Sequence, residues 1–303
     1  MDTEKIITDP YHNPSGRFVL FTSEHITNKY LDIPYDTLSD DQKLDIYLPE
    51  RIDGKLPLLV YIHGGGFEMG DRKYGHIHKF IEGIDRGYAV ASVSYRLSKE
   101  KVFPAAVQDV RNAIRFLRKH AEEYGIDEKR IGIFGESAGG NLVSILAMDP
   151  QEEIFDAHIP ESLKGISAAV TACVNWFGVI DMNVALDQNL ENNLRPPKFT
   201  KDNCPESRYF GKSLLELPVE WINKANAITY ISDRMCPMLI EHGTGDFNVA
   251  VQQSQMLYRA IVEKVGQERV ELFMLEGAVH EDPRFERDEN MAILWTFFDR
   301  LLK

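Results

Sequence analysis

Gly135-Glu136-Ser137-Ala138-Gly139 is the stretch of this 303-residue chain that most narrowly predicts its fold. The apolar run 130–134 precedes it and residues 140–147 follow with helical spacing, so the pattern is strand, tight turn and helix. A turn this sharp needs small residues beside its central side chain, and glycines supply them. It would hold Ser137 above a sheet, where the N-terminus of the following helix offers N–H groups to negative charge.

Strand and helix patterns alternate along most of the chain. Two period-2 segments, 26–35 and 43–49, predict edge strands, and the continuous apolar run 56–62 predicts a buried parallel strand. Further strands are expected over 88–95, 166–177, 236–243 and 269–275, and helices over 104–119, 251–265 and 290–302. This alternation predicts an α/β fold with a mostly parallel, twisted sheet of about eight strands and helices on both faces.

No linker or internal repeat divides the chain, so a single domain is expected over residues 1–303. Residues 1–30 are polar and mixed, and we expect them to lie on the surface. Residues 183–230 interrupt the alternation with a polar, proline-containing segment, which predicts a cap-like insertion that shapes specificity.

Charge and composition narrow the classes of partner. The 34 Lys and Arg residues against 47 Asp and Glu residues give a net charge of −13, which disfavours nucleic acid and anionic lipid. The first residues lack a secretory signal pattern, and no run approaches the roughly 20 apolar residues of a membrane span. We therefore expect a cytoplasmic protein without a membrane partner. The three cysteines lack metal-type spacing and are assigned no chemistry, and a homo-oligomer is compatible with the sequence.

A second motif, His63-Gly64-Gly65-Gly66-Phe67, directly follows the expected strand 56–62. Consecutive glycines cost conformational entropy, and backbone N–H groups held close to a ligand would explain them. In an acyl-transfer site, Gly65 and Gly66 would donate to the tetrahedral oxyanion together with the N–H of Ala138. The alternative is a flexible strand-to-helix turn. A phosphate-binding loop is disfavoured because the sequence lacks the Gly-x-x-x-x-Gly-Lys-Ser/Thr pattern here.

A serine nucleophile needs a base within hydrogen-bond reach and a carboxylate that orients the base. Asp246 follows the strand that ends at residue 243, and His280 follows the strand that ends near residue 275. The order Ser, Asp, His is the one associated with this sheet topology. The sequence therefore predicts Ser137, Asp246 and His280 as a catalytic triad.

Other polar residues compete for these roles. Structural roles fit His63 and His242 better, and Asp282 is too close to His280 along the chain to orient it. We expect Glu136 to be a surface or loop-pairing residue.

His76 and His78 have a spacing that could indicate a metal. No cysteine or carboxylate cluster accompanies them in the sequence, so no metal is expected.

Aromatic residues near the expected site predict a substrate pocket. Trp176 and Phe177 lie at the carboxyl end of the expected strand 166–177, where open α/β sheets gather their ligands. With Phe67 of the glycine-rich motif they are the predicted substrate-binding residues. Ordinary core packing is the alternative for these rings.

Together these motifs resemble the α/β-hydrolase superfamily in its hormone-sensitive-lipase-like branch. More narrowly, the chain resembles bacterial carboxylesterases grouped as bifunctional feruloyl and acetyl-xylan esterase-like. The likeness runs from about residue 42 to the C-terminus and includes Tyr95-Arg96-Leu97, Pro104-Ala105-Ala106 with Asp109, Pro205-Glu206-Ser207 and Gln252-Gln253-Ser254. It implies an α/β-hydrolase fold without a cofactor, the triad Ser137, Asp246 and His280, and the oxyanion donors Gly65, Gly66 and Ala138.

The chain departs from the family pattern at two places. Residues 246–250 read Asp-Phe-Asn-Val-Ala where relatives often have Asp-Pro-x-Val-Pro, and residues 189–202 have no clear counterpart. The shape of the loop that carries Asp246 and the size of the pocket therefore do not follow from the resemblance.

The resemblance implies hydrolysis of small-molecule esters, including acetyl or feruloyl esters of plant carbohydrates. Short acyl chains are expected because the sequence shows no long apolar lid or interfacial helix. A second hypothesis is an amidase similar to kynurenine formamidases, which share the glycine-rich loop and the order of the triad. A third is a hydrolase-like binding protein without catalysis, against which the presence of Ser137, Asp246 and His280 argues.

Overall fold

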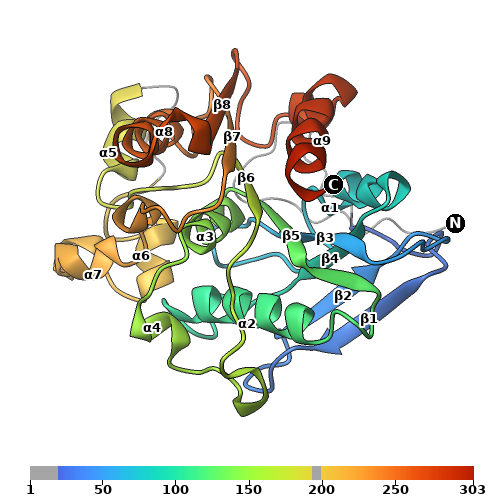
Figure 1. The fold of residues 1–303 in the computed structure, drawn as a ribbon. Coiled ribbons are helices and arrows are strands. Elements are labelled where there is room, and N and C mark those ends of the chain that lie inside the picture. Colours follow the sequence, from blue (N-terminus) through green and yellow to red (C-terminus); the bar gives the residue numbers. More distant parts are fainter. Residues whose placement is uncertain (1–19, 193–198) are drawn as a thin grey trace, which may run out of the picture.

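The computed structural model describes residues 20–192 and 199–303. Residues 1–19 of the expected N-terminal surface segment, and residues 193–198 of the expected cap, lie outside the described residues. Within the described part, one eight-stranded sheet organises the chain (Figure 1).

The sheet is parallel over most of its width. Its order is β1-β2-β4-β3-β5-β6-β7-β8, with antiparallel pairing of β1 to β2 and of β2 to β4 and parallel pairing elsewhere. This confirms the predicted α/β fold. The strands are β1 (Lys29–Pro34), β2 (Lys43–Tyr47), β3 (Leu56–Ile62), β4 (Ala89–Val93), β5 (Ile126–Glu136), β6 (Ala172–Trp176), β7 (Met238–Gly243) and β8 (Val270–Leu275).

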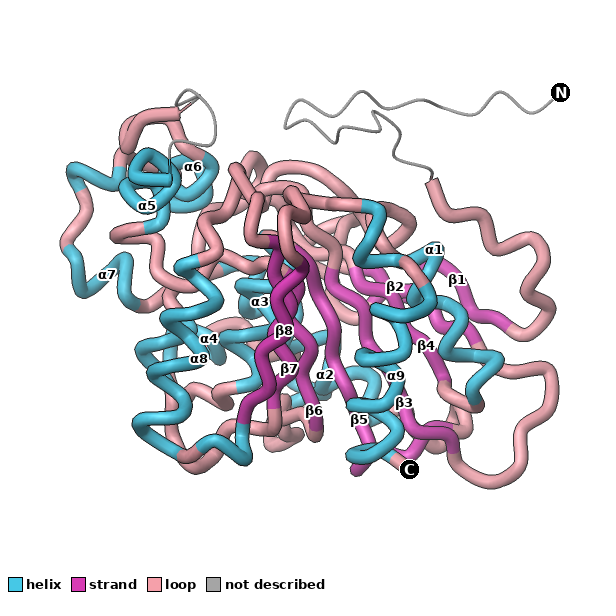
Figure 2. Tube along the Cα trace, turned by 90° about the horizontal axis from the view of Figure 1, so that it is seen from above, coloured by secondary structure: helices cyan, strands magenta, loops and turns pink. Residues whose placement is uncertain are grey.

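Helices cover both faces of the sheet (Figure 2). α2 (Ala105–Lys119), α3 (Ala138–Ala147) and α8 (Gln252–Val265) pack on one face, and α1 (Ile77–Phe80) and α9 (Asp288–Leu302) pack on the other. Alternate side chains of β3 enter the two layers. The burial of both faces explains the continuous apolar run in the sequence of this strand.

Short helices complete the described chain. α4 (Glu153–Asp156) packs against α2. The 3-10 helices are η1 (Ile81–Arg86), η2 (Glu161–Leu163), η3 (Leu214–Glu216), η4 (Ala227–Tyr230), η5 (Gln267–Arg269) and η6 (Pro283–Glu286). The sequence analysis did not predict the helical segment formed by α1 and η1.

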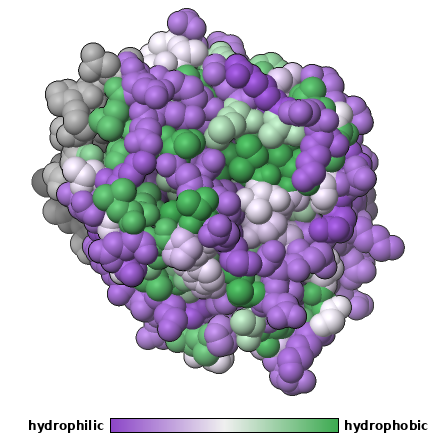
Figure 3. Space-filling model, turned by 90° about the vertical axis from the view of Figure 1, so that its left-hand side faces the viewer, coloured by the Kyte–Doolittle hydropathy of each residue, from purple (hydrophilic) through white to green (hydrophobic). Residues whose placement is uncertain are grey.

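The segment 183–230 forms short helices in place of a core element. α5 (Ala185–Asn192), α6 (Pro205–Phe210) and α7 (Val219–Asn223) gather at one end of the molecule (Figures 1 and 2). The side of the molecule that carries them has hydrophobic patches within a largely hydrophilic surface (Figure 3). Leu190, Leu215 and Val219 of this segment have large exposed side chains. The role of residues 183–230 as a cap stays a prediction.

The strand expected over 166–177 is shorter than predicted, because β6 begins only at residue 172. The backbone before it is bound by arginines of α2: Arg115 Nε donates to the carbonyl of Ile166 at 3.1 Å, and Arg118 donates to that of Ala169 at 2.7 Å. Guanidinium groups therefore satisfy carbonyls that a neighbouring strand would otherwise bind.

Candidate active site

Ser137 stands at the turn between β5 and α3. Its backbone has φ 54° and ψ −118°, a conformation that non-glycine residues rarely adopt. Every other residue between 131 and 148 is buried, and Ser137 alone is partly exposed. A Cβ atom on Gly139 would collide with the carbonyl of Ile62 at the end of β3, so the turn can approach the neighbouring strand only with glycine there.

Three side chains that are far apart in the sequence meet at this turn. His280 Nε2 lies 3.0 Å from Ser137 Oγ, and His280 Nδ1 lies 2.7 Å from Asp246 Oδ2. Ser137, Asp246 and His280 follow β5, β7 and β8, whose carboxyl ends lie at the same edge of the sheet. The geometry is that of a nucleophile, a base and an orienting acid joined by hydrogen bonds.

Asp246 is held in its ionised form by its surroundings. Its Oδ1 accepts from the backbone N–H groups of Asn248 and Val249 at 2.8 and 2.9 Å. Burial alone would raise the pKa of Asp246, but His280 and His242 lower this pKa far below its usual range. A charged carboxylate therefore faces the ring of His280 at neutral pH.

His242 has a structural role beside Asp246. Its Nδ1 lies 2.6 Å from Ser254 Oγ, and its Nε2 lies 3.0 Å from the carbonyl of Val249. These contacts close the loop that carries Asp246, where the sequence departs from the family pattern.

The glycine-rich motif lies against the serine turn. Gly65 and Gly66 have φ values of 100° and 61°, in the left-handed region that favours glycine. The N–H of Gly64 donates to Glu136 Oε1 at 2.9 Å. Among the described residues, the N–H groups of Gly65, Gly66 and Ala138 donate no hydrogen bond to the protein. They are therefore free to serve a developing oxyanion.

Glu136 does not lie on the surface, so that expectation is wrong. It does pair with a loop, which was the other expected role. The side chain is 1% exposed, and Oε1 also accepts from Tyr61 Oη at 2.6 Å. Burial raises the pKa of Glu136 to about 8, against the lowering effect of His76. Its partner Gly64 lies 72 residues away, so no local pattern could reveal the contact.

The loop after β4 supports the glycine-rich motif from the other side. Tyr95 Oη donates to the carbonyl of His63 at 2.9 Å, and the two rings stack with centroids 4.3 Å apart. The N–H of Ser98 donates to the carbonyl of Phe67 at 2.8 Å. The conformation of the candidate oxyanion loop therefore depends on this second loop.

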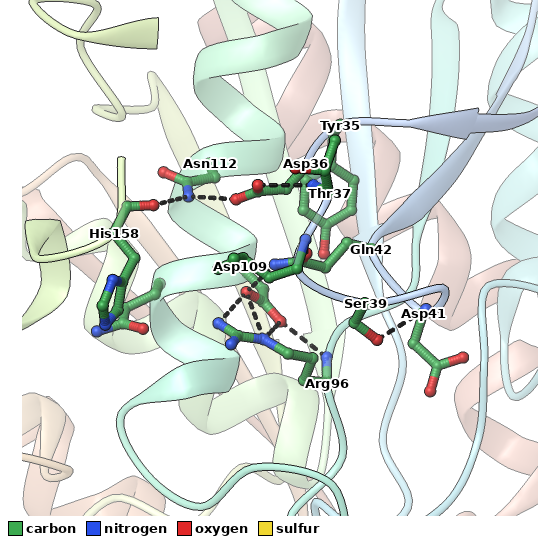
Figure 4. A network of polar contacts seen from close by, with 12 residues as sticks. Tyr35, Asp36, Thr37, Ser39, Asp41, Gln42, Arg96, Asp109, Asn112 and His158 are labelled. Carbon is green, nitrogen blue, oxygen red and sulfur yellow. Dashed lines mark hydrogen bonds and ion pairs between the residues drawn. The ribbon is translucent and has the colours of Figure 1, made fainter. Parts of the chain in front are cut away.

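A buried ion pair anchors the second loop to α2 (Figure 4). Arg96 Nη2 donates to Asp109 Oδ1 at 2.7 Å and Arg96 Nε to Oδ2 at 2.9 Å, while Asp109 also accepts from Gln42 Nε2 at 2.7 Å. Arg96 and Asp109 are 6% and 0% exposed. The carboxylate thus satisfies a guanidinium that has little access to water.

The three predicted substrate-binding residues lie close to the site, but their rings are buried. Phe67 stacks on Tyr209 of α6 with centroids 3.9 Å apart, and Phe177 packs edge-on against His280 at 4.7 Å. Trp176 lies in the layer that contains α1 and α9. They support the site from beneath its surface, and their contact with a substrate stays a prediction.

His76 and His78 have carboxylate neighbours in space that lie about 200 residues away in the sequence. Glu286 lies 2.6 Å from His76 and 3.1 Å from His78, and Glu281 lies 2.7 Å from His76. No group of His, Cys, Asp or Glu side chains within residues 20–192 and 199–303 is arranged to hold a metal ion.

Cys173, Cys204 and Cys236 are buried free thiols. No helix in the described part of the chain is both long and apolar enough to cross a membrane.

The family model for BD-FAE matches residues 44–261. The chain belongs to the BD-FAE family. This match covers the serine turn, the glycine-rich motif and Asp246, and it confirms the resemblance that the motifs indicated.

Curated relatives of this BD-FAE protein are ester hydrolases by name. It is 28% identical to the probable carboxylic ester hydrolase LipM of Mycobacterium tuberculosis, over 74% of this chain and 49% of the relative. It is 26% identical to esterase LipQ of the same organism, over 82% of this chain and 56% of the relative. The chain thus spans about half the length of the curated relatives it matches.

Two solved structures contain a domain with this fold. A protein described as bifunctional GH43-CE from Bacteroides eggerthii superposes with a TM-score of 0.81 at 28% identity, covering 91% of this chain and 35% of that protein. A truncated carbohydrate esterase from gut microbiota superposes with a TM-score of 0.80 at 24% identity, covering 92% and 98% of the two chains. The second likeness shows the fold alone.

Proposed function

We propose that this BD-FAE protein is a serine carboxylesterase that hydrolyses short-chain acyl esters. The observation that carries the proposal is the continuous hydrogen-bonded line from Ser137 through His280 to Asp246, with distances of 3.0 and 2.7 Å. The names of the relatives, which are carboxylic ester hydrolases and esterases, support the same reaction class.

In the first half of the reaction, Ser137 Oγ attacks the ester carbonyl while His280 Nε2 accepts its proton. Asp246 accepts the hydrogen bond from Nδ1 and stabilises the imidazolium that forms. The oxygen of the tetrahedral intermediate receives hydrogen bonds from the N–H groups of Gly65, Gly66 and Ala138. His280 then returns the proton to the leaving alcohol, which departs as the acyl-enzyme forms.

In the second half, a water molecule attacks the acyl-enzyme and His280 takes a proton from this water. The same N–H groups stabilise the second tetrahedral intermediate. Its collapse breaks the bond to Ser137 Oγ, which regains a proton from His280, and releases the carboxylic acid, which ionises at neutral pH. The net charge of −13 favours departure of the anionic product.

The substrates we propose are acetyl or feruloyl esters of plant carbohydrates. The resemblance of the motifs supports this class, as does the 28% identity to the protein described as bifunctional GH43-CE. The segment 183–230 would select the alcohol part, because Tyr209 of α6 stacks directly on Phe67 of the glycine-rich motif. Activity on a panel of acyl and sugar esters would identify the acyl and alcohol parts.

The Ser137→Ala variant tests the nucleophile. We expect kcat for p-nitrophenyl acetate to fall by at least roughly 10⁴-fold with an unchanged circular dichroism spectrum, because no other group can form the acyl-enzyme. Ser162→Ala, at an exposed position, is the matched control and should retain wild-type activity. Substantial activity in Ser137→Ala would refute the assignment.

Two further measurements separate the alternative functions. An amidase would cleave N-formylkynurenine faster than an aryl acetate, whereas the proposed esterase prefers the acetate. A fluorophosphonate probe should label the wild-type protein but not Ser137→Ala. A binding protein without catalysis would remain unlabelled.

A further inference from the structure

His76 lies between two carboxylates just before α1. Its Nε2 is 2.7 Å from Glu281 Oε2, and its Nδ1 is 2.6 Å from Glu286 Oε1. A neutral imidazole carries one N–H, so it can donate to one of these carboxylates only. When both carboxylates are ionised, two contacts of this length require the imidazolium form of the ring.

Both carboxylates follow His280 in the chain. Glu281 is the next residue in the chain and has a φ of 57°, in the left-handed region, while Glu286 ends η6. The ring of His76 is buried and packs edge-on against Trp176 with centroids 5.1 Å apart. His76 thus ties the chain directly after His280 to the layer that contains Trp176.

Several charged or titratable groups face this ring or its carboxylates. Glu281 and Glu286 contact it directly, and His78 Nε2 shares Glu286 at 3.1 Å. Across the cluster, electrostatic interactions link Glu136 of β5 to His76 and to Glu281. The remaining groups are Tyr61 of β3, which bonds Glu136 at 2.6 Å, and His280, which interacts with Glu281.

The electrostatics agree with the geometry. Burial lowers the pKa of His76, but Glu281 and Glu286 outweigh burial and raise this pKa well above its ordinary value. In return, His76 lowers the pKa of both Glu281 and Glu286, against burial. The charged triplet is therefore the favoured state at neutral pH.

We propose that His76 is a positioning residue whose imidazolium clamps Glu281 and Glu286, the two carboxylates that follow His280, so that ester hydrolysis is lost at alkaline pH when His76 loses its proton. This inference rests on the proposed role of His280 as the base. Deprotonation leaves one carboxylate oxygen facing a ring lone pair at hydrogen-bond distance. Repulsion then displaces Glu281 or Glu286 and, through the backbone that joins them to it, moves His280 from its position 3.0 Å from Ser137 Oγ.

The experiment is a pH–rate profile of kcat for triacetin in a pH-stat, from about pH 6 to about pH 10. Wild-type protein should show an alkaline limb in kcat. Glu286→Gln should move this limb to lower pH by about one unit or more, because one of the two carboxylates that keep His76 charged is gone. His76→Gln should lack the limb and show kcat reduced by roughly 10- to 100-fold through misplacement of His280, with KM little changed.

Matched controls separate the clamp from nonspecific effects. His120→Gln removes a partly exposed histidine that contacts Glu123 at 2.9 Å, and it should leave the profile unchanged. The side chain of Glu286 is 25% exposed, so we expect Glu286→Gln to fold. This variant therefore tests the proposal even if His76→Gln does not fold.

A readout that needs no activity completes the test. In ¹⁵N-histidine NMR spectra, the signal that His76→Gln removes should report a ring protonated on both nitrogens at neutral pH. A neutral His76 in that spectrum, or superposed profiles for wild type and Glu286→Gln, would overturn the clamp. Wild-type protein without ester hydrolysis at any pH would instead refute the proposed function, while the NMR result still decides the state of His76.

Discussion

At the scale of single residues, Asp246 offers a test that leaves the site's shape intact. In Asp246→Asn the amide would hold His280 in the wrong tautomer, with Nδ1 as acceptor and Nε2 as donor, so Nε2 could not take the proton of Ser137. We expect kcat for p-nitrophenyl acetate to fall roughly 10⁴-fold with KM little changed. Asp187→Asn, on the partly exposed surface of α5, is the control. A fall of less than about tenfold would assign the orienting role elsewhere.

The sequence contains enough information to place the three residues of the candidate triad in space. Ser137, Asp246 and His280 each follow an apolar strand, and parallel strands bring their carboxyl ends to one edge. The environment of these residues was not predictable in the same way. Glu136 and His76 make their decisive contacts with residues 72 and 205 positions away, and neither contact leaves a local pattern.

At the scale of structural elements, the buried strands were the most predictable part. β3 coincides with the run 56–62 because both faces of this strand are covered by helices, so almost every residue had to be apolar. β6 and α1 were not placed correctly. The residues before β6 are β-branched or small and fit a strand, but arginines of α2 bind their carbonyls, and α1 has only four residues to show a helical period.

The ion pair between α2 and the loop after β4 supports a prediction about stability. Asp109→Ala leaves the guanidinium of Arg96 buried without its carboxylate, and the free energy of unfolding should fall by about 3–5 kcal/mol. Urea denaturation measures this loss. Replacing both residues, as in Arg96→Met with Asp109→Leu, should restore much of it, because no unpaired charge then remains buried.

The control for this pair is an exposed one. Lys212 and Glu216 lie 3.3 Å apart with both side chains more than half exposed, so Glu216→Ala should cost no more than about 1 kcal/mol. Equal losses for Asp109→Ala and Glu216→Ala would show that Arg96 reaches water when its partner is removed.

At the scale of the whole molecule, buried acids couple folding to pH. Asp246 is ionised through its histidine partners, whereas Glu241 on β7 is fully buried with Asn290 Nδ2 at 2.6 Å from its Oε2. Burial raises the pKa of Glu241 from its ordinary 4.5 to about 8. The folded chain therefore keeps a proton on Glu241 at pH 7 that the unfolded chain releases.

The sign of the resulting stability change follows from this difference. Between about pH 4.5 and about pH 8 the unfolded state gains stability by losing the proton of Glu241, so folding weakens as the pH rises. Glu241→Gln removes the titration while its amide oxygen still accepts from Asn290. The free energy of unfolding of this variant relative to wild type should therefore increase with pH, by up to about 1.4 kcal/mol per unit, and level off above about pH 8. Urea denaturation at several pH values measures the slope, with Glu220→Gln on the exposed surface as the control that shows none. A difference between Glu241→Gln and wild type that stays constant across this range would mean that Glu241 is already ionised in the folded protein.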